Sequence, residues 1–410
     1  MYNTRTTSVF RVTDRNSNSF SMKVFSYFEE LPLPVKARQL QSFASDRSIL
    51  LKLTKSLCPE VLEQVKSSAE PRDVVCDSHH VQLLLGVDVP VLDEIGNTLK
   101  SQLMNISNSQ GYETQRRVDF SANTLVPYIS GGRLGDVIDH RPEFKSLLHR
   151  YITYTTLSNQ LVRAVKYIHS VGVSHLSIDP STVICSNKDC SEVFLSDFGQ
   201  GATEASVTSS MYATEIMQDS VRFMAFDDNP NADIDKKIIE KLKEYQSAKP
   251  SWESAKKVDW FALGGTLFYL VAGSRIYVDS LMFSSKSSRP LSNFIVDTMT
   301  FKNMASKMKT KTDEKSLGKI RHFVGDSLLL IDGLLTVDRE KRISFDSDDG
   351  RKRINSSLRA SKSVMSALEI DGGSKSSSSC ASFIQETGAV LPELRVDEHH
   401  RLPSFMQEIC

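Results

Sequence analysis

The sequence has no run of about 18 apolar residues, the length that a membrane-spanning helix requires. Its longest helical apolar stretch, Phe261–Ala272, is shorter and predicts a buried helix. The first 25 residues are polar and alternating, so they do not form a secretory signal peptide. A mature chain whose leader had been removed would look the same, and secretion therefore stays open.

Net charge is also absent, because 50 Lys and Arg balance 50 Asp and Glu. This balance disfavours a nucleic-acid binder whose affinity depends on neutralising phosphates. The six cysteines form no CxxC pair and no cluster with histidine, so no structural zinc site is expected. Cys185 and Cys190 bracket a turn between two apolar runs, the pattern of a β-hairpin. Two interpretations stay open: a disulfide across the hairpin or two free thiols.

What the chain does contain is 410 residues of ordinary globular composition, enough for two or three folding units or one large two-lobed one. Its first third alternates apolar and polar residues and predicts strands, with a helical insertion. The expected elements are a hairpin over Ser8–Val12 and Ser19–Tyr27, helices from about Val35 to Val65, and strands over Val81–Val91 and Ser121–Tyr128.

From Gly131 onward the pattern becomes helical. Apolar residues at three- and four-residue spacings predict an amphipathic helix over Lys145–Ser170 and a second over Ala232–Gln246. Further helices are expected from Val258 and over Gly325–Leu335. After about Asp346 the composition shifts to Ser, Lys, Arg and Gly, which predicts a largely disordered tail over residues 346–410.

Four segments in a fixed order resemble the large lobe of the protein kinase superfamily. They are VGVSHLSIDPSTVIC (Val171–Cys185), VFLSDFGQG (Val193–Gly201), VDWFALGGTLFYLVAG (Val258–Gly273) and LLLIDGLLTVDREKRIS (Leu328–Ser344). The resemblance implies an α+β, two-lobed kinase-like fold with a strand-rich lobe at 1–128 and a helical lobe at 129–345. It also implies that Asp197, of Asp197-Phe198-Gly199, is the metal-binding Asp of the DFG motif, and that Asp259 accepts hydrogen bonds from the catalytic-loop backbone.

In the first third, FSMKVF resembles the kinase strand that carries the phosphate-binding lysine, here Lys23. No glycine precedes Gly86, so the glycine-rich loop that covers the nucleotide phosphates is either absent or lies in an upstream part that is not in this chain. No Glu occurs between Leu31 and Pro59, so the helix that should supply a carboxylate to Lys23 offers only Asp46. We expect Asp46 to be a surface charge.

The catalytic loop departs from the kinase pattern His-Arg-Asp-Leu-Lys-x-x-Asn. Its first position is His175, but Leu176, Ser177, Asp179 and Thr182 replace the Arg, the Asp base, the Lys and the metal-binding Asn. A serine hydroxyl cannot accept a proton near neutral pH. The acidic Asp179 reverses the charge that faces the transferring phosphoryl group, which raises the barrier.

Further along, Arg222–Asp227 resembles the Ala-Pro-Glu segment, with Asp227 in place of Glu and able to pair with Arg342 as a buried, fold-holding ion pair. The FSMKVF strand, the AEPRD stretch from Ala69 and the hairpin cysteines are similar to the rhoptry kinase family of apicomplexan parasites. This resemblance implies a secreted protein of the parasitophorous vacuole or host cell; a cytoplasmic location is the alternative.

The sequence therefore predicts a catalytically inactive pseudokinase that binds a protein partner, such as an active kinase or a host factor, as a scaffold or allosteric regulator. No cofactor is expected: Lys23 and Asp197 remain as vestigial nucleotide-binding residues, with weak ATP binding at most. The alternative is an atypical active kinase or another transferase that uses Asp179 or Asp197 as its base. In the tail, Arg351-Lys352-Arg353 before Ser356 and Ser357 is either a phosphorylation motif or a solvated segment.

Overall fold

The structure is a computed structural model in which two compact units are distinguished. One contains Met1–Ile129 together with Asp197–Gly199, and the other contains Ser130–Ser196 together with Gln200–Lys375. The structure describes residues 2–3, 7–13, 19–28, 32–57, 79–87, 116–141, 147–187, 190–207, 251–272, 326–327, 329–331, 333–335 and 341–367.

The first unit contains an antiparallel sheet in the order β1-β2-β3-β5-β4. Its strands are β1 (Tyr2–Asn3), β2 (Thr7–Thr13), β3 (Ser19–Phe28), β4 (Gly86–Val87) and β5 (Arg116–Pro127). The predicted hairpin is confirmed as β2 and β3. Strand β5 begins at Arg116, earlier than predicted. Of the predicted strand Val81–Val91, residues 81–87 are described, and within them Gly86–Val87 join the sheet as β4.

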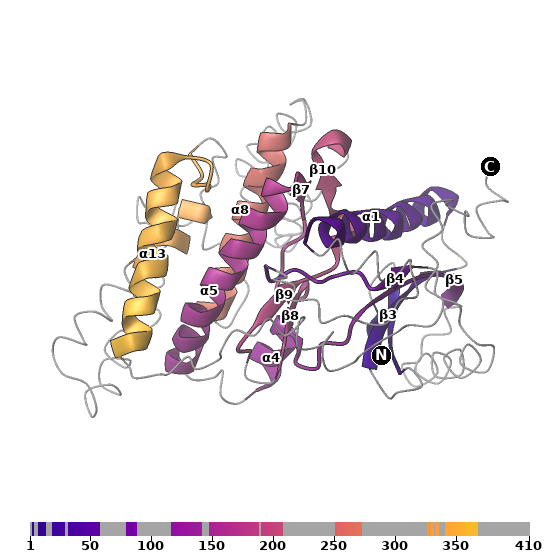
Figure 1. Ribbon diagram of the computed structural model, residues 1–410, viewed down its shortest axis with the longest axis horizontal. Coiled ribbons are helices and arrows are strands. Elements are labelled where there is room, and N and C mark those ends of the chain that lie inside the picture. The colour runs from indigo at the N-terminus through magenta and orange to yellow at the C-terminus, as the bar shows by residue number, and fades with distance from the viewer. Residues whose placement is uncertain are drawn as a thin grey trace, which may run out of the picture. The chain divides into compact units, whose positions relative to one another are not determined.

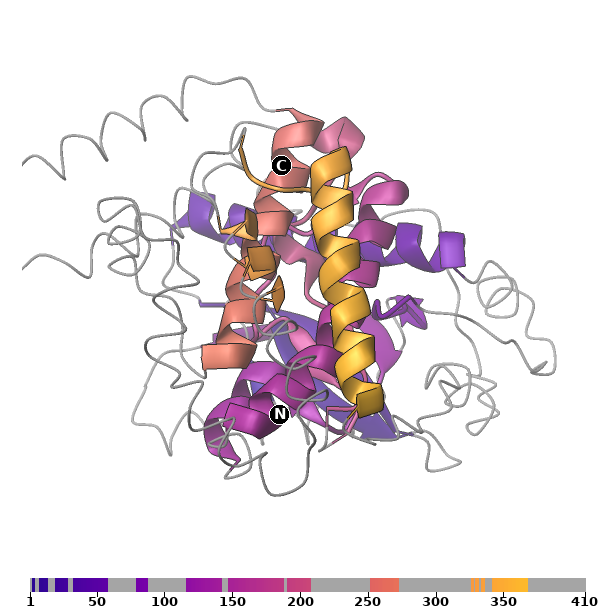
Figure 2. The ribbon, with the colours of Figure 1, turned by 90° about the vertical axis from the view of Figure 1, so that its left-hand side faces the viewer.

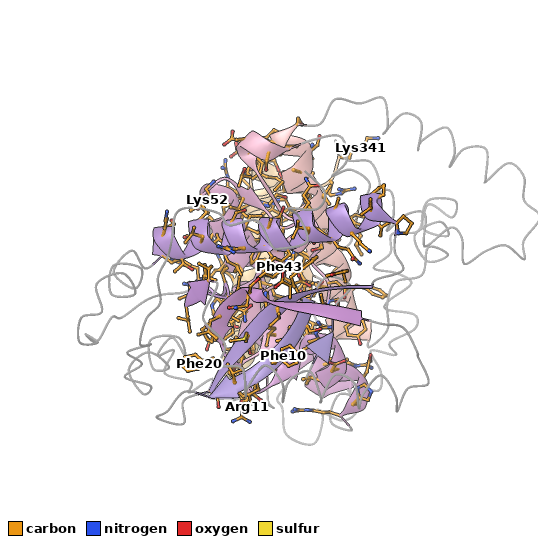
Figure 3. The ribbon with its side chains drawn as sticks, turned by 90° about the vertical axis from the view of Figure 1, so that its right-hand side faces the viewer. Phe10, Arg11, Phe20, Phe43, Lys52 and Lys341 are labelled. Atoms are coloured by element: carbon orange, nitrogen blue, oxygen red, sulfur yellow. A yellow bond between two sulfur atoms is a disulfide. The ribbon has the colours of Figure 1, made fainter. Side chains whose placement is uncertain are left out.

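Helix α1 (Leu33–Leu57) packs on one face of this sheet (Figure 3). Phe43 of α1 and Phe25 of β3 have ring centroids 5.5 Å apart, and Leu40 and Ala122 complete the cluster. Because side chains alternate along a strand, Lys23 lies on the same side of β3 as Phe25, toward α1. The helix therefore decides which residues surround Lys23.

The second unit is built around helix α5 (Leu147–Ser170), which packs between α8 (Trp252–Ala272) and α13 (Asp348–Ala367) (Figures 1 and 2). The helices predicted over Lys145–Ser170 and from Val258 are confirmed as α5 and α8. Helix α8 is buried almost throughout, and a Cβ added to Gly264 would lie 2.8 Å from the Cβ of Leu334. Glycine at this position permits close packing. No helix in the part of the chain that the structure describes is long and apolar enough to cross a membrane.

Short elements position the loops of the second unit. The strands among them form two small sheets, in the orders β6-β8-β9 and β10-β7. The strands are β6 (Gly132–Arg133), β7 (Val173–Ser174), β8 (Val183–Cys185), β9 (Val193–Leu195) and β10 (Ala202–Thr203), and they are accompanied by helix α4 (Leu134–His140) and the 3-10 turn η3 (Glu204–Ser206). A further 3-10 turn, η2 (Phe198–Gln200), begins in the Asp197–Gly199 segment of the first unit. A disulfide joins Cys185 and Cys190, with Cα atoms 4.9 Å apart, and so resolves the two interpretations of these cysteines.

The prediction that the chain is disordered from residue 346 is wrong for residues 348–367, which form α13. Two features missed in the composition explain the helix. Ile354 and Ser357, three residues apart, are buried on one face. Asp349 and Arg353, four residues apart, form an ion pair of 3.0 Å. The predicted helix over Ala232–Gln246 and the tail beyond Ala367 lie outside the described residues. Within the predicted helix Gly325–Leu335, residues 326–327, 329–331 and 333–334 are described and helical.

Candidate functional site

The kinase-motif residues of the first unit form a buried cluster around Asp46. The Nζ atom of Lys23 lies 3.2 Å from Oδ2 of Asp46, and the two residues are 6% and 2% exposed. The expectation that Asp46 is a surface charge is therefore wrong. It lies on the same face of α1 as Phe43 and Leu50, three residues before and four after it, and both are buried.

The second carboxylate oxygen of Asp46 accepts a hydrogen bond from the backbone N–H of Phe198, with an N···O distance of 2.7 Å. Burial raises the pKa of Asp46 and the nearby Asp197 carboxylate raises it further, while Lys23 and the Phe198 N–H oppose these effects. A single carboxylate thus ties strand β3 and helix α1 to the Asp197-Phe198-Gly199 motif. In this cluster Lys23 already has an anionic partner.

The backbone of the Asp197-Phe198-Gly199 motif is tightly constrained. Asp197 has a positive φ of 67°, which is unusual for a residue with a side chain. Phe198 is fully buried, and a Cβ added to Gly199 would lie 2.5 Å from Oγ of Ser42. Among the described residues, no three His, Cys, Asp or Glu side chains gather into a group that could hold a metal ion.

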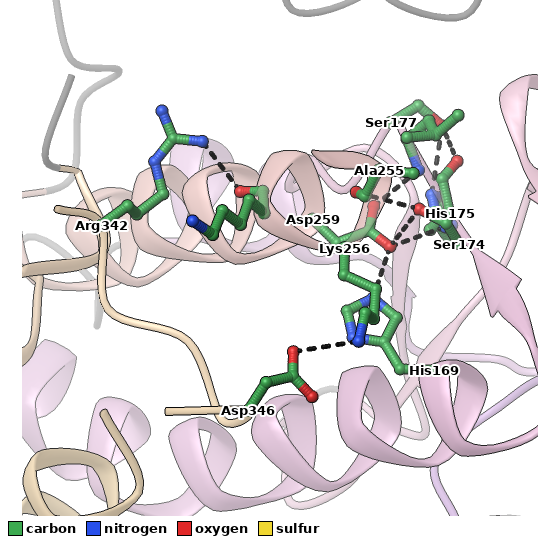
Figure 4. Close-up of polar contacts among 11 residues, drawn as sticks. His169, Ser174, His175, Ser177, Ala255, Lys256, Asp259, Arg342 and Asp346 are labelled. Atoms are coloured by element: carbon green, nitrogen blue, oxygen red, sulfur yellow. Dashed lines mark hydrogen bonds and ion pairs between the residues drawn. The ribbon is translucent and has the colours of Figure 1, made fainter. Parts of the chain in front are cut away.

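In the second unit, the loop between β7 and β8 is held by Asp259 of α8 (Figure 4). Its Oδ2 accepts a hydrogen bond from the His175 N–H at 2.8 Å, and its Oδ1 accepts one from the Leu176 N–H at 2.6 Å. These are the backbone contacts expected of Asp259. Oδ2 also lies 2.8 Å from the Ser174 hydroxyl and 2.8 Å from Nε2 of His169.

Burial alone would raise the pKa of Asp259, but the hydrogen bond and charge of His169, with the contributions of His175, outweigh it and lower the pKa. His169 was not identified from the sequence. The signal that could have found it is its position on the apolar stripe of α5, four residues after Val165 and seven after Val162, both buried. A histidine at such a position requires a buried polar partner.

Leu176 stands where kinases have an arginine, and it fills an apolar site. It is 2% exposed, packs with Ala202, Ala255 and Val258, and adopts a positive φ of 59°. A cationic side chain in this cluster would be buried among apolar groups. Leu176 therefore packs as an apolar side chain at the position where kinases have the arginine.

Ser177, at the position of the kinase base, is bonded to the histidine two residues before it (Figure 4). Its Oγ lies 3.1 Å from Nδ1 of His175, and 3.5 Å from the His175 carbonyl oxygen. Nε2 of His175 lies 3.0 Å from the carbonyl oxygen of Ser196. A carbonyl only accepts, so in the neutral ring the proton is on Nε2, and Ser177 donates its hydroxyl proton to Nδ1.

Asp179 and Thr182 are bonded to the loop itself. The Thr182 hydroxyl oxygen accepts a hydrogen bond from the Asp179 N–H at 3.0 Å, and its proton faces the carbonyl oxygens of Asp179 at 3.0 Å and Ser177 at 3.2 Å. Oδ1 of Asp179 accepts the Ser181 N–H at 2.9 Å. These side chains stabilise the turn before β8, a role that the sequence did not reveal.

Arg342, the other residue assigned to holding the fold, is 5% exposed. Its guanidinium donates to the carbonyl oxygen of Lys257 at 2.9 Å and lies 4.6 Å from the ring centroid of Phe261. Both contacts are to α8. Asp227, its expected partner, lies outside the described residues, so their ion pair stays a prediction.

Comparisons with known proteins give limited similarity. No protein-family model matches the chain. It is 28% identical over 110 residues to the "Probable serine/threonine-protein kinase fhkC" of Dictyostelium discoideum, which covers 27% of this chain and only 17% of that protein. Similar solved structures include a Toxoplasma gondii specific rhoptry antigen kinase domain, with a TM-score of 0.43, 13% identity and coverage of 86% of this chain and 79% of that one. Another is Rad53 1-466 in complex with AMP-PNP, with a TM-score of 0.38, 16% identity and coverage of 86% and 61%.

Part of the chain is similar to protein kinases. The basis is the order of its motifs, the contacts of Lys23, Asp46, Phe198 and Asp259, and the sequence similarity to a probable protein kinase. The α+β composition, with a sheet in the first unit and helices in the second, agrees with this assignment.

Proposed function

We propose that this protein is a pseudokinase, a kinase-like module that binds a protein partner and does not transfer phosphate. The observation that carries the proposal is the bonding of the catalytic loop. The side chains at the base, lysine and metal-ligand positions, Ser177, Asp179 and Thr182, all bond within the loop.

The loss of the base and of the lysine should slow phosphoryl transfer by a large factor. A positioned general base contributes about 10²–10⁴-fold to a rate, and Ser177 donates its proton where a base would accept one. At the position of the lysine, Asp179 brings a negative charge instead of a positive one. Two unit charges about 4 Å apart interact by about 4 kcal/mol at an effective dielectric constant of about 20, which corresponds to about 10³-fold in rate. Together these losses would make phosphoryl transfer too slow to be useful.

Tight nucleotide binding is not expected either. The ammonium group of Lys23 is paired with Asp46 in a buried site, and a phosphate would have to share or displace that pair. The connection between β1 and β2, where kinases have the glycine-rich loop, contains no glycine. Glycines let backbone amides approach a phosphate closely, and this connection lacks them.

A thermal-shift experiment with ATP and Mg²⁺ or Mn²⁺ tests the nucleotide part of this proposal. A ligand at 100 times its Kd would stabilise the folded state by about 2.7 kcal/mol and raise Tm. Because no tight nucleotide binding is expected, Tm should stay unchanged. A phosphoryl-transfer assay with a generic protein substrate tests the catalytic part, and Asp197→Ala is its matched control. Transfer by the wild type that Asp197→Ala abolishes would show that the protein is an active kinase.

The partner and the location are proposals of the same kind. A scaffold requires a protein partner, and affinity capture from the native source, compared with capture on an unrelated bait, should recover a specific one. Recovery of chaperones alone would contradict the scaffold. The Cys185–Cys190 disulfide supports a secreted location, since disulfides persist in oxidising compartments. Fractionation of the native source should find the protein outside the cytosol.

A further inference from the structure

The Ser177–His175 pair has the geometry of a nucleophile and its base. The Oγ–Nδ1 distance of 3.1 Å is within hydrogen-bond reach, and Ser177 is only partly buried while His175 is fully buried (Figure 4). In enzymes that use a serine nucleophile, the base lies within about 2.6–3.2 Å of the hydroxyl and is oriented by a third group.

The third group here is the Ser196 carbonyl oxygen, 3.0 Å from Nε2 of His175. It fixes the ring orientation and keeps the Nε2 proton in place, so Nδ1 presents its lone pair to the hydroxyl. A base must have this tautomer before it can take a proton. The 3.5 Å distance to the His175 carbonyl oxygen makes that atom the weaker acceptor for the same hydroxyl.

A carboxylate near the histidine favours the charged ring that proton transfer would produce. Oδ2 of Asp259 accepts the backbone N–H of His175 at 2.8 Å, and Asp259 is fully buried. The charge of His175 is among the causes that lower the pKa of Asp259, so the carboxylate and the charged ring attract each other, and this attraction favours the imidazolium form. The pair thus has a hydroxyl, an oriented base and a nearby negative charge.

We propose that Ser177 is a nucleophile, with His175 as its base, that accepts an acyl group from a neutral activated ester. Ser177 Oγ attacks the carbonyl carbon and passes its proton to Nδ1 of His175. The bond between that carbon and the leaving oxygen then breaks, and the leaving alcohol takes the proton from His175. The step needs no nucleotide and no metal, so it goes beyond the proposed function and does not depend on it.

The charge of the loop selects the class of substrate. Asp179 lies two residues after Ser177, in the position where kinases have a lysine, and its carboxylate accepts the Ser181 N–H. An anionic ester or a phosphorylated donor would approach this carboxylate at a cost, whereas an uncharged ester would not. A neutral ester is therefore favoured over a nucleoside triphosphate.

A covalent probe tests the proposal on the full-length protein. The folded protein is treated with an uncharged alkyl fluorophosphonate, whose phosphorus accepts the serine oxygen while fluoride leaves, and the adducts are mapped by peptide mass spectrometry. Ser177→Ala should remove the main adduct, and His175→Gln, which keeps an amide donor for Ser196 but no base, should slow labelling by about 10²-fold. Ser130→Ala is the matched control, because Ser130 is exposed and its hydroxyl donates to a backbone carbonyl rather than to an imidazole.

If His175→Gln fails to fold, a comparison of the labelling rates of two serines in the wild-type protein still decides the test. Ser177 should react at least about tenfold faster than Ser130 in the same folded molecule, and this excess should disappear in denaturant. Release of p-nitrophenol from p-nitrophenyl acetate should show a burst that Ser177→Ala abolishes. Labelling of Ser177 no faster than of Ser130, or an unchanged rate in folded His175→Gln, would overturn the proposal. Neither result would affect the kinase assay that tests the proposed function.

Discussion

The buried pair of Lys23 and Asp46 allows a sharp test of what holds the first unit together. We consider Lys23→Met, Asp46→Asn and the double variant. In the wild type, the Phe198 N–H lies 2.7 Å from one Asp46 oxygen, and Lys23 lies 3.2 Å from the other. Asp46→Asn keeps an oxygen that can accept the Phe198 N–H but removes the charge that faces Lys23. Lys23→Met keeps the length of the side chain without the ammonium group.

The structure gives different magnitudes for the single and double variants. Both side chains are more than nine-tenths buried, and removing one partner of a buried ion pair costs about 3–5 kcal/mol, because the other charge is left uncompensated. The double variant removes both charges and leaves mainly one unsatisfied amide N–H₂, which costs about 1–3 kcal/mol. The single losses would add to about 6–10 kcal/mol, so the coupling should be at least about 3 kcal/mol.

Urea unfolding, followed by tryptophan fluorescence and far-UV circular dichroism, measures this double-mutant cycle. The exposed pair Asp349–Arg353, at 3.0 Å, is the matched control, and its cycle (Asp349→Asn, Arg353→Met) should give about 0.5 kcal/mol or less. If the Lys23 and Asp46 losses simply added, the two charges would not interact in the folded protein. The reasoning about this cluster would then be refuted.

Three further variants test other parts of the structure. Asp259→Asn should lower the free energy of unfolding by about 3–5 kcal/mol at neutral pH. Because the pKa of Asp259 is lowered from its ordinary 3.8, the difference from the wild type, measured by urea unfolding at several pH values, should shrink as the pH falls below 3.8. Gly199→Ala should lower the free energy of unfolding by about 1–3 kcal/mol, because its Cβ would meet Ser42 Oγ at 2.5 Å, and Ser42→Ala should recover part of it. Cys190→Ser should cost about 2 kcal/mol by opening the short loop to Cys185, and an equal Tm for this variant and the oxidised wild type would contradict it.

Periodicity in the sequence predicted the regular elements because their burial patterns are local. The alternation along β2 and β3 and the three- and four-residue spacing along α5 are visible without any tertiary information. Helix α13 was missed for the opposite reason. Its sequence is rich in Ser, Lys and Arg, and the buried stripe that includes Ile354 is recognisable only when α5 is present to cover it.

Site residues that belong to a sequence motif were predicted, whereas a residue whose role depends on a tertiary contact was missed. Lys23, Asp197 and Asp259 were found by motif, and the backbone contacts of Asp259 are as expected. The partnership of Asp46 was not predicted, because the helix has no glutamate and its aspartate was expected to be a surface charge. The closeness of α1 to β3 at Phe25 and Phe43 makes the shorter side chain sufficient, and the sequence does not contain that distance.

The buried carboxylates and the hydroxyls of the catalytic loop differ in how many hydrogen-bond donors they need. Asp46 and Asp259 are buried charges, and each is surrounded by donors because an unpaired buried carboxylate would destabilise the fold by several kcal/mol. Ser177 and Thr182 carry neutral hydroxyls, for which one or two local hydrogen bonds are enough. A side chain that acts on a phosphoryl group contributes to rate and not to folding, so replacing it with a self-bonded hydroxyl removes catalysis at little cost in stability. The loop can therefore keep a kinase-like position under Asp259 while the groups that act on a phosphoryl group are lost.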